Sequence, residues 1–201
     1  MRKIVITGIG TDVGKTVVSA IVAEHLKASY WKPVQSGDLE NSDSVKVKRL
    51  TDNVTVLEEK YKLTEPLSPH ESARIDKVTI DMNTFSIPEV NSNLIIEGAG
   101  GLMVPFNYKG DVYLDLFEKW NLPVVVVSRH YLGSINHTLL TINALKQRNI
   151  PILGIIFSGE SDQASEEVIL NATKTKCIAR IPEASEVNKS FVIEQAKKLN
   201  L

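Results

Sequence analysis

One stretch near the start of the chain constrains the fold more than any other. A β-branched run at 3–7 leads into a glycine-containing turn at 8–16, and an apolar helical pattern follows from Lys15 to Lys27. A strand, a glycine-rich turn and a helix in this order cradle the phosphates of a nucleotide, because backbone N–H groups and the positive end of the helix face the anion. The sequence therefore predicts phosphate chemistry.

Lys15 and Thr16 carry the chemistry of this turn. A flexible lysine reaches the β- and γ-phosphates, and a threonine hydroxyl binds a magnesium ion. The usual spacing, Gly-x4-Gly-Lys-Ser/Thr, would place a glycine where this chain has Ile9. Gly8 and Gly10 flank that position, and the loop reads Gly-x5-Gly-Lys-Thr instead, a one-residue variant. A glycine-rich helix start that binds nothing is the alternative explanation.

Composition argues against several classes of function. The 201 residues are 43% hydrophobic, which suits one α/β domain over 1–201 with a buried sheet. A net charge of −1 argues against a general nucleic-acid or membrane-surface binder. Cys177 is the only cysteine, so an internal disulfide and a cysteine-based zinc site are excluded. With neither a signal-peptide pattern nor a long apolar run, we expect a soluble cytoplasmic protein.

Strand and helix patterns alternate along the rest of the chain. Strands are predicted at 30–34, 93–97, 123–128, 152–157 and 177–181, and helices at 42–51, 135–147, 164–173 and 186–199. The region 36–91 is the least regular, and an extended connection is expected after its helix. The alternation predicts an α/β fold with a doubly wound, mostly parallel sheet and helices on both faces. Ligands then bind at the carboxyl ends of the strands.

Charged residues follow two of these strands. Lys32, beside a proline turn, is placed to hold a carboxylate or to stabilise a phosphoryl group in transfer, unless it is a solvated lysine on an edge strand. Glu97 ends an apolar strand before a glycine turn and suits magnesium, unless it only caps that turn. Asp43 is a further candidate metal ligand, although an aspartate in the first turn of a helix usually stabilises the helix dipole.

Six motifs follow one another in the chain. They are Gly-Thr-Asp-Val-Gly-Lys-Thr at 10–16, Lys-Pro-Val-Gln-Ser-Gly at 32–37, Asn-Ser-Asp at 41–43, Ser-Pro-His at 68–70, Glu-Gly-Ala-Gly-Gly at 97–101 and Leu-Gly-Ser-Ile-Asn-His at 132–137. In this order, over about residues 3–157, they resemble the dethiobiotin synthetase family of homodimeric, doubly wound P-loop NTPase-type domains. The resemblance implies ATP-dependent carboxylation and cyclisation of 7,8-diaminononanoate with CO2 to dethiobiotin, through a carbamate and a carbamic-phosphoric anhydride, releasing ADP and phosphate.

The resemblance also assigns roles to the residues that match its motifs. The catalytic set would be Lys15, Lys32, Thr11 and Ser36, and magnesium would be bound by Thr16, Asp43 and Glu97. ATP would contact Asp12, Val13, Gly14, Lys15, Thr16, Val17, Asp43, Glu97, Gly98, Ala99 and Gly100, with Ser158, Ile181, Pro182 and Glu183 near its base. The diamine would contact Thr11, Lys32 and Ser36, and its carboxylate would bind Ser134, Ile135 and Asn136 of the other subunit. An ordinary helix cap is the alternative for that last group.

One departure from the family concerns the nucleobase. Where the family usually presents an asparagine to adenine, this chain has Ser158, whose hydroxyl makes fewer paired contacts than an amide, so a shallow nucleotide preference is expected. Two other classes stay open: a partition or cell-division ATPase that switches on DNA or membrane, and a related amidating or diamide-type synthase. Such switch ATPases typically carry an additional lysine early in the loop, where this chain has none.

Overall fold

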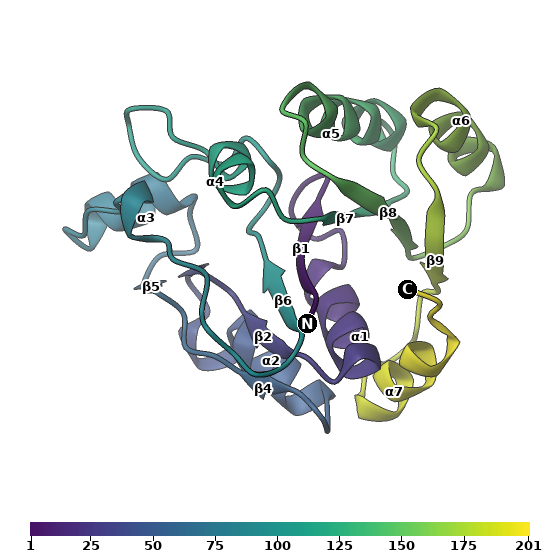
Figure 1. Cartoon of the computed structure of the whole chain (residues 1–201), viewed down its shortest axis with the longest axis horizontal. Coiled ribbons are helices and arrows are strands. Elements are labelled where there is room, and N and C mark those ends of the chain that lie inside the picture. The colour runs from purple at the N-terminus through teal and green to yellow at the C-terminus, as the bar shows by residue number, and fades with distance from the viewer.

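The computed structural model describes all residues from 1 to 201. Its main sheet is built from β1 (Lys3–Gly8), β2 (Ser29–Trp31), β4 (Thr55–Val56), β6 (Leu94–Glu97), β7 (Val124–Arg129), β8 (Ile152–Ser158) and β9 (Cys177–Ile181). The strand order is β4-β2-β6-β1-β7-β8-β9, and every neighbouring pair is parallel. Because β1 lies between β6 and β7, the chain winds outward from it in both directions, as Figure 1 shows. The predicted doubly wound α/β fold is confirmed.

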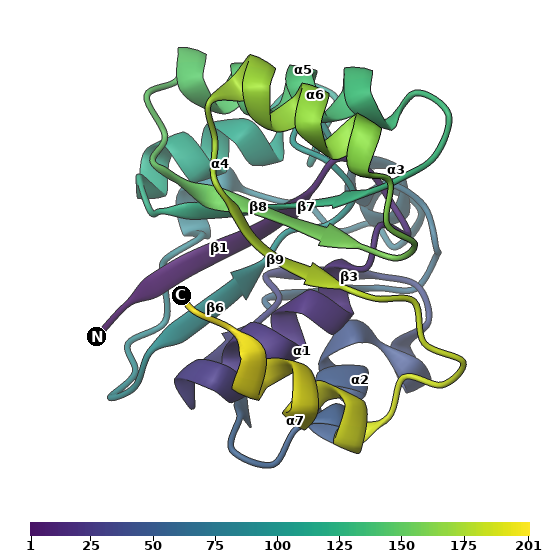
Figure 2. The same cartoon turned by 90° about the vertical axis from the view of Figure 1, so that its right-hand side faces the viewer.

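Helices cover both faces of this sheet (Figures 1 and 2). One face carries α1 (Lys15–Leu26), α2 (Asp43–Leu50) and α7 (Lys189–Lys198), and the other carries α4 (Tyr113–Trp120), α5 (Ser134–Gln147) and α6 (Gln163–Thr173). The central strands are thereby buried from two sides, and the four valines at 124–127 are fully inaccessible. This two-sided burial is the reason that the strands are near-continuous apolar runs in the sequence.

The structure corrects the sequence prediction in three places. The strand predicted at 30–34 is two strands, β2 and β3 (Val34–Ser36), because Pro33 has no N–H with which to continue a ladder. The expected extended connection contains β4, β5 (Tyr61–Leu63) and α3 (Pro69–Ile75). There, β5 pairs with β3 in a second, two-stranded sheet. The helix α4, which follows an irregular glycine-rich loop, is also absent from the prediction.

The core and the parallel strands together position the site. The buried hydrophobic residues form one cluster of 44 that runs between the sheet and its helices. Because the strands are parallel, the residues after β1, β2, β6 and β7 all lie along one edge of the sheet. None of the helices has both the length and the apolar character that crossing a membrane requires.

Candidate active site

Glycines shape the loop between β1 and α1. Gly14 adopts a left-handed φ of +89°, and a Cβ there would lie 2.5 Å from the Ser158 Oγ. A Cβ at Gly8 would lie 2.7 Å from the Val13 side chain, whereas a Cβ at Gly10 would meet only the Tyr131 hydroxyl at 3.9 Å. Gly8 and Gly14 are therefore the glycines that the loop requires. This geometry accounts for the Gly-x5-Gly spacing.

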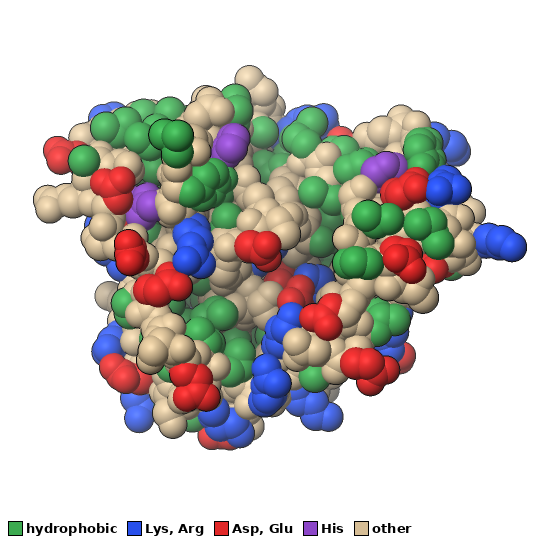
Figure 3. All heavy atoms as spheres, turned by 180° about the vertical axis from the view of Figure 1, so that it is seen from behind, with side chains coloured by type: hydrophobic (Ala, Val, Ile, Leu, Met, Phe, Trp, Pro, Cys, Tyr) green, Lys and Arg blue, Asp and Glu red, His purple; other side chains and the backbone are tan.

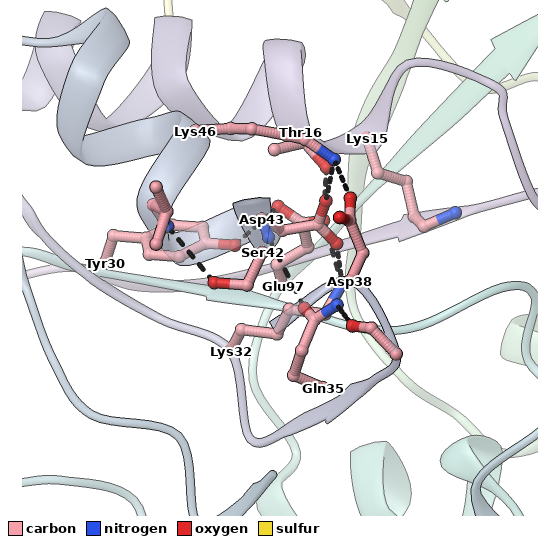
Figure 4. Close-up of polar contacts among 12 residues, drawn as sticks. Lys15, Thr16, Tyr30, Lys32, Gln35, Asp38, Ser42, Asp43, Lys46 and Glu97 are labelled. Carbon is pink, nitrogen blue, oxygen red and sulfur yellow. Dashed lines mark hydrogen bonds and ion pairs between the residues drawn. The ribbon is translucent and has the colours of Figure 1, made fainter. Parts of the chain in front are cut away.

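Lys15 begins α1 and folds back over the loop. Its Nζ donates a hydrogen bond to the Gly10 carbonyl at 2.7 Å, and Figure 4 shows the side chain pointing away from the nearby carboxylates. Burial lowers the pKa of Lys15; the positive charge of Lys32 adds to this effect, and the carboxylate of Glu97 opposes it. No side chain caps the start of α1, so its first N–H groups remain available to an anion.

Lys32 joins two carboxylates that come from different elements. Its Nζ forms an ion pair with Asp43 and lies 3.5 Å from the Glu97 Oε1. Burial lowers the pKa of Lys32, but Glu97 and Asp43 outweigh burial and raise it overall. Burial raises the pKa of Asp43, but the positive charge of Lys32 lowers it by more, so the pKa of Asp43 is lowered overall. Lys32 and Asp43 are therefore both charged near neutral pH.

Thr16 and the two carboxylates form a set of oxygen donors suited to magnesium. The Thr16 hydroxyl donates to the Glu97 Oε1 at 3.0 Å, and Asp43 is the first residue of α2, where the Ser42 side chain caps the helix. The structure contains no cluster of three or more His, Cys, Asp or Glu side chains that could hold a metal. Magnesium in phosphoryl-transfer sites uses one or two carboxylates together with water and phosphate oxygens, so this sparse set fits that ion.

These side chains surround a cavity of about 620 Å³. Figure 3 shows the surface hollowed near its centre, with acidic and basic side chains lying together in the hollow. The buried Ser36 hydroxyl has no partner, so it is free to bond to a ligand. Eleven of the predicted site residues line this cavity: Thr11, Asp12, Gly14, Lys15, Thr16, Val17, Lys32, Ser36, Asp43, Ala99 and Gly100.

The other predicted residues lie beneath or outside the cavity. Val13 and Glu97 are buried, and Gly98 packs against the ring of Phe117. The Ser158 side chain lies against the loop at Gly14. Buried Ile181 precedes Pro182 and Glu183, which line a smaller cavity of about 310 Å³. Ser134, Ile135 and Asn136 line a further cavity of about 830 Å³ at the start of α5, which shares no lining residue with the first.

Eight residues that line the main cavity are absent from the predicted set, and three of them carry an amide or a charge: Gln35, Lys46 and Arg129. Gln35 accepts from the backbone N–H at the start of α2 at 3.4 Å. Lys46 pairs with Asp38 at 3.1 Å, and Arg129 pairs with Glu183 at 3.0 Å, which ties the end of β7 to the turn after β9. Gln35 lies within the motif at 32–37, which is a signal that could have found it. Lys46 and Arg129 lie outside the motifs, and only the packing of the elements turns them toward the cavity.

Comparison with known proteins identifies the family. A family model described as an AAA domain matches residues 2–190. The chain is 54% identical to the ATP-dependent dethiobiotin synthetase BioD of Christiangramia forsetii over 195 residues, which cover 96% of this chain and 93% of the relative. The chain belongs to the ATP-dependent dethiobiotin synthetase family. The dethiobiotin synthetases of Rhodopseudomonas palustris and Brucella anthropi are 46% and 43% identical to it, over 90% and 93% of this chain and 87% and 89% of their own lengths.

Solved structures of distant proteins share the fold of this dethiobiotin synthetase family member. The septum site-determining protein MinD of Pyrococcus horikoshii, complexed with Mg-ADP, superposes with a TM-score of 0.58 at 14% identity, over 98% of this chain and 95% of that one. A plasmid partition protein of Borrelia burgdorferi bound to AMPPNP gives a TM-score of 0.57 at 13% identity, over 96% and 90%. These likenesses show the fold alone. The close relatives confirm the predicted family and its class of ATP-dependent ligase, and they decide against the two alternative classes.

Proposed function

We propose that this chain converts 7,8-diaminononanoate, CO2 and ATP into dethiobiotin, ADP and phosphate. The observation that carries the proposal is that Lys15, Lys32 and Thr16 line one cavity, with the buried Glu97 carboxylate beneath it against Thr16 and Lys32, in a chain 54% identical to an ATP-dependent dethiobiotin synthetase. A cation-rich cavity beside a phosphate-binding loop suits a reaction in which negative charge moves between carbamate and phosphate.

The reaction has three steps, in which atoms and charges balance. One amine of the diamine takes up CO2 and loses a proton, which gives a carbamate. A carbamate oxygen attacks the γ-phosphorus, and ADP leaves. The second amine then attacks the carbamoyl carbon and loses a proton, the carbon–oxygen bond to phosphate breaks, and phosphate leaves as the cyclic urea closes. No covalent bond to the protein forms, and catalysis consists of positioning and charge neutralisation.

The proposed roles are those that the family's motifs imply, and the positions of the side chains support them. Lys15 binds the β- and γ-phosphates, and Lys32 stabilises the carbamate and the phosphoryl group in transfer. Thr11 and Ser36 contact the diamine, which is supported by the unpartnered Ser36 hydroxyl at the cavity wall. Gly100 lies on the same wall, where its φ of +59° and the 2.6 Å distance from a Cβ to the Val104 side chain both require glycine.

Magnesium would be held by Thr16, Asp43 and Glu97. When bound, the ion would neutralise charge on the β- and γ-phosphate oxygens. The nucleotide would also contact the backbone at 12–17 and at 97–100, where Gly98 and Ala99 allow close approach. Its base would lie toward Ser158 and the turn at 181–183, which is supported by the smaller cavity beside that turn.

We propose further that two copies of this single-domain protein form a cytoplasmic homodimer in which each copy completes the partner's site. Ser134, Ile135 and Asn136 would bind the diamine's carboxylate. Two observations support this assignment: Gly133 precedes α5 without any side-chain cap, and Leu132 beside it is fully exposed. A free helix N-terminus receives a carboxylate, and an exposed leucine suits a subunit interface.

One assay tests the proposed reaction. Phosphate release from ATP should require both diaminononanoate and bicarbonate, and omitting either should reduce release to background. Dethiobiotin formed should equal phosphate released. ATP hydrolysis that proceeds equally well without the diamine would contradict the proposal.

A further inference from the structure

A buried tyrosine holds the oxygen of Glu97 that Thr16 leaves free. The Thr16 hydroxyl donates to Oε1 at 3.0 Å, and Lys32 Nζ lies 3.5 Å from the same oxygen. The Tyr30 hydroxyl donates to Oε2 at 2.9 Å. Figure 4 shows the tyrosine reaching this carboxylate from the neighbouring strand. Both carboxylate oxygens are therefore engaged, each by a different element.

The sheet register explains how Tyr30 reaches Glu97. In the parallel pair of β2 and β6, Tyr30 lies beside Ile95. Residues paired across a sheet project from the same face, and residues two apart on one strand also share a face. Tyr30 and Glu97 therefore project from the same face of the sheet. Glu97 lies two residues beyond Ile95, the partner of Tyr30, and a tyrosine side chain can span that offset.

The hydrogen bond between Tyr30 and Glu97 is shielded from water. Tyr30 and Glu97 are both fully inaccessible, and the phenol has no other hydrogen-bond partner in the structure. A phenol is a hydrogen-bond donor at neutral pH, and the Glu97 carboxylate oxygen accepts from it. A buried carboxylate oxygen without a donor would be strongly disfavoured, so the bond is retained.

We propose that Tyr30 is a positioning residue that commits Oε2 of Glu97 and leaves Oε1, beside the Thr16 hydroxyl, as the oxygen that binds the metal. This inference rests on the proposed function, in which Glu97 is a magnesium ligand. Groups that hydrogen-bond to a metal ligand orient it, and their removal typically weakens metal affinity about 10- to 100-fold.

The chain supplies a matched control at Tyr113. This side chain is also buried, with 1% of its surface exposed, but its hydroxyl makes no hydrogen bond to Glu97. Tyr30→Phe and Tyr113→Phe therefore remove the same atom from the same core, and only the first change removes a bond to Glu97. A merely structural effect of losing a buried hydroxyl would appear in both variants.

The test uses Mn²⁺ as a spectroscopic probe for magnesium, titrated by electron paramagnetic resonance into protein saturated with a non-hydrolysable ATP analogue. We expect Tyr30→Phe to raise the Mn²⁺ dissociation constant at least about tenfold and Tyr113→Phe to leave it unchanged. In turnover, the magnesium concentration for half-maximal rate should rise in Tyr30→Phe while the rate at saturating magnesium recovers. Equal Mn²⁺ affinity in Tyr30→Phe and the wild type would overturn the inference.

Two further measurements separate this inference from the proposed function. If Glu97→Gln binds Mn²⁺ as the wild type does, the metal role of Glu97 fails, and the inference fails with it. If Glu97→Gln loses Mn²⁺ while Tyr30→Phe keeps it, only the role of Tyr30 fails. Binding of the ATP analogue without metal reports on the fold. A Tyr30→Phe protein that loses this binding as well would show Tyr30 to be a structural residue and would refute its positioning role.

Discussion

Replacing Lys32 with methionine removes a cation from between two carboxylates and keeps the length of the side chain. The Lys32 side chain is 5% exposed and Glu97 is inaccessible. Two unit charges 3.5 Å apart attract by about 5 kcal/mol at an effective dielectric constant of ~20. That attraction offsets a burial cost of several kcal/mol for the ammonium, and removing one partner leaves the other charge buried and uncompensated. We expect the free energy of unfolding to fall by about 3 to 5 kcal/mol.

The same variant should change how stability depends on pH. Burial raises the pKa of Asp43, but Lys32 outweighs burial and lowers it overall. A carboxyl whose folded pKa is depressed contributes stability that is fully present above its unfolded pKa, near ~4, and is lost as the pH falls through the folded value. Without Lys32, this contribution shrinks. The loss of stability between neutral and acid pH should therefore be shallower in Lys32→Met than in the wild type.

Urea unfolding without nucleotide measures the effect, with Lys46→Met as the matched control. Lys46 lines the same cavity, but its side chain is 32% exposed. It pairs with Asp38 at 3.1 Å and more distantly with Asp43 at 3.9 Å, so its removal should cost less than about 1 kcal/mol. The m-values should not change. In turnover, Lys32→Met should form no dethiobiotin while still binding an ATP analogue. Equal urea midpoints for the two variants would refute the electrostatic reasoning, and near-normal product formation would remove Lys32 from the mechanism.

Three further predictions concern the loop and the base. Gly8→Ala should weaken ATP-analogue binding and lower stability by about 1 to 3 kcal/mol, because its Cβ would lie 2.7 Å from the Val13 side chain. Gly10→Ala should match the wild type in calorimetry and thermal melting. Similar losses in both variants would contradict the loop geometry. Burial lowers the pKa of Lys15, and only the charged lysine binds phosphate, so the affinity for an ATP analogue should begin to fall at a lower alkaline pH than it would for an ordinary lysine. An affinity that falls only above pH ~10 would contradict a lowered Lys15 pKa. Turnover with ATP, GTP and CTP should differ only modestly, since Ser158 packs on the loop; a strong adenine preference would mean that another residue reads the base.

Much of the fold and part of the site follow from local sequence. The order of strand, glycine turn and helix identifies the phosphate-binding loop, because glycine spacing and an apolar strand are properties of consecutive residues. Alternating strands and helices predict the parallel sheet for the same reason. The region 51–91 escaped prediction, because its strands are only two and three residues long and their pairing depends on partners distant in the sequence.

The sequence by itself determined the loop, the charges at the strand ends and, through its motifs, the family. Only the tertiary structure decided which of those charges meet. Tyr30 and Glu97 are 67 residues apart in the sequence and touch because β2 and β6 are neighbours in the sheet. Lys32 follows β2 and meets Glu97 at the end of β6 for the same reason, and its ion pair with Asp43 joins both to α2. Strand order and helix packing come from burying the whole core at once, so no short stretch of residues encodes them.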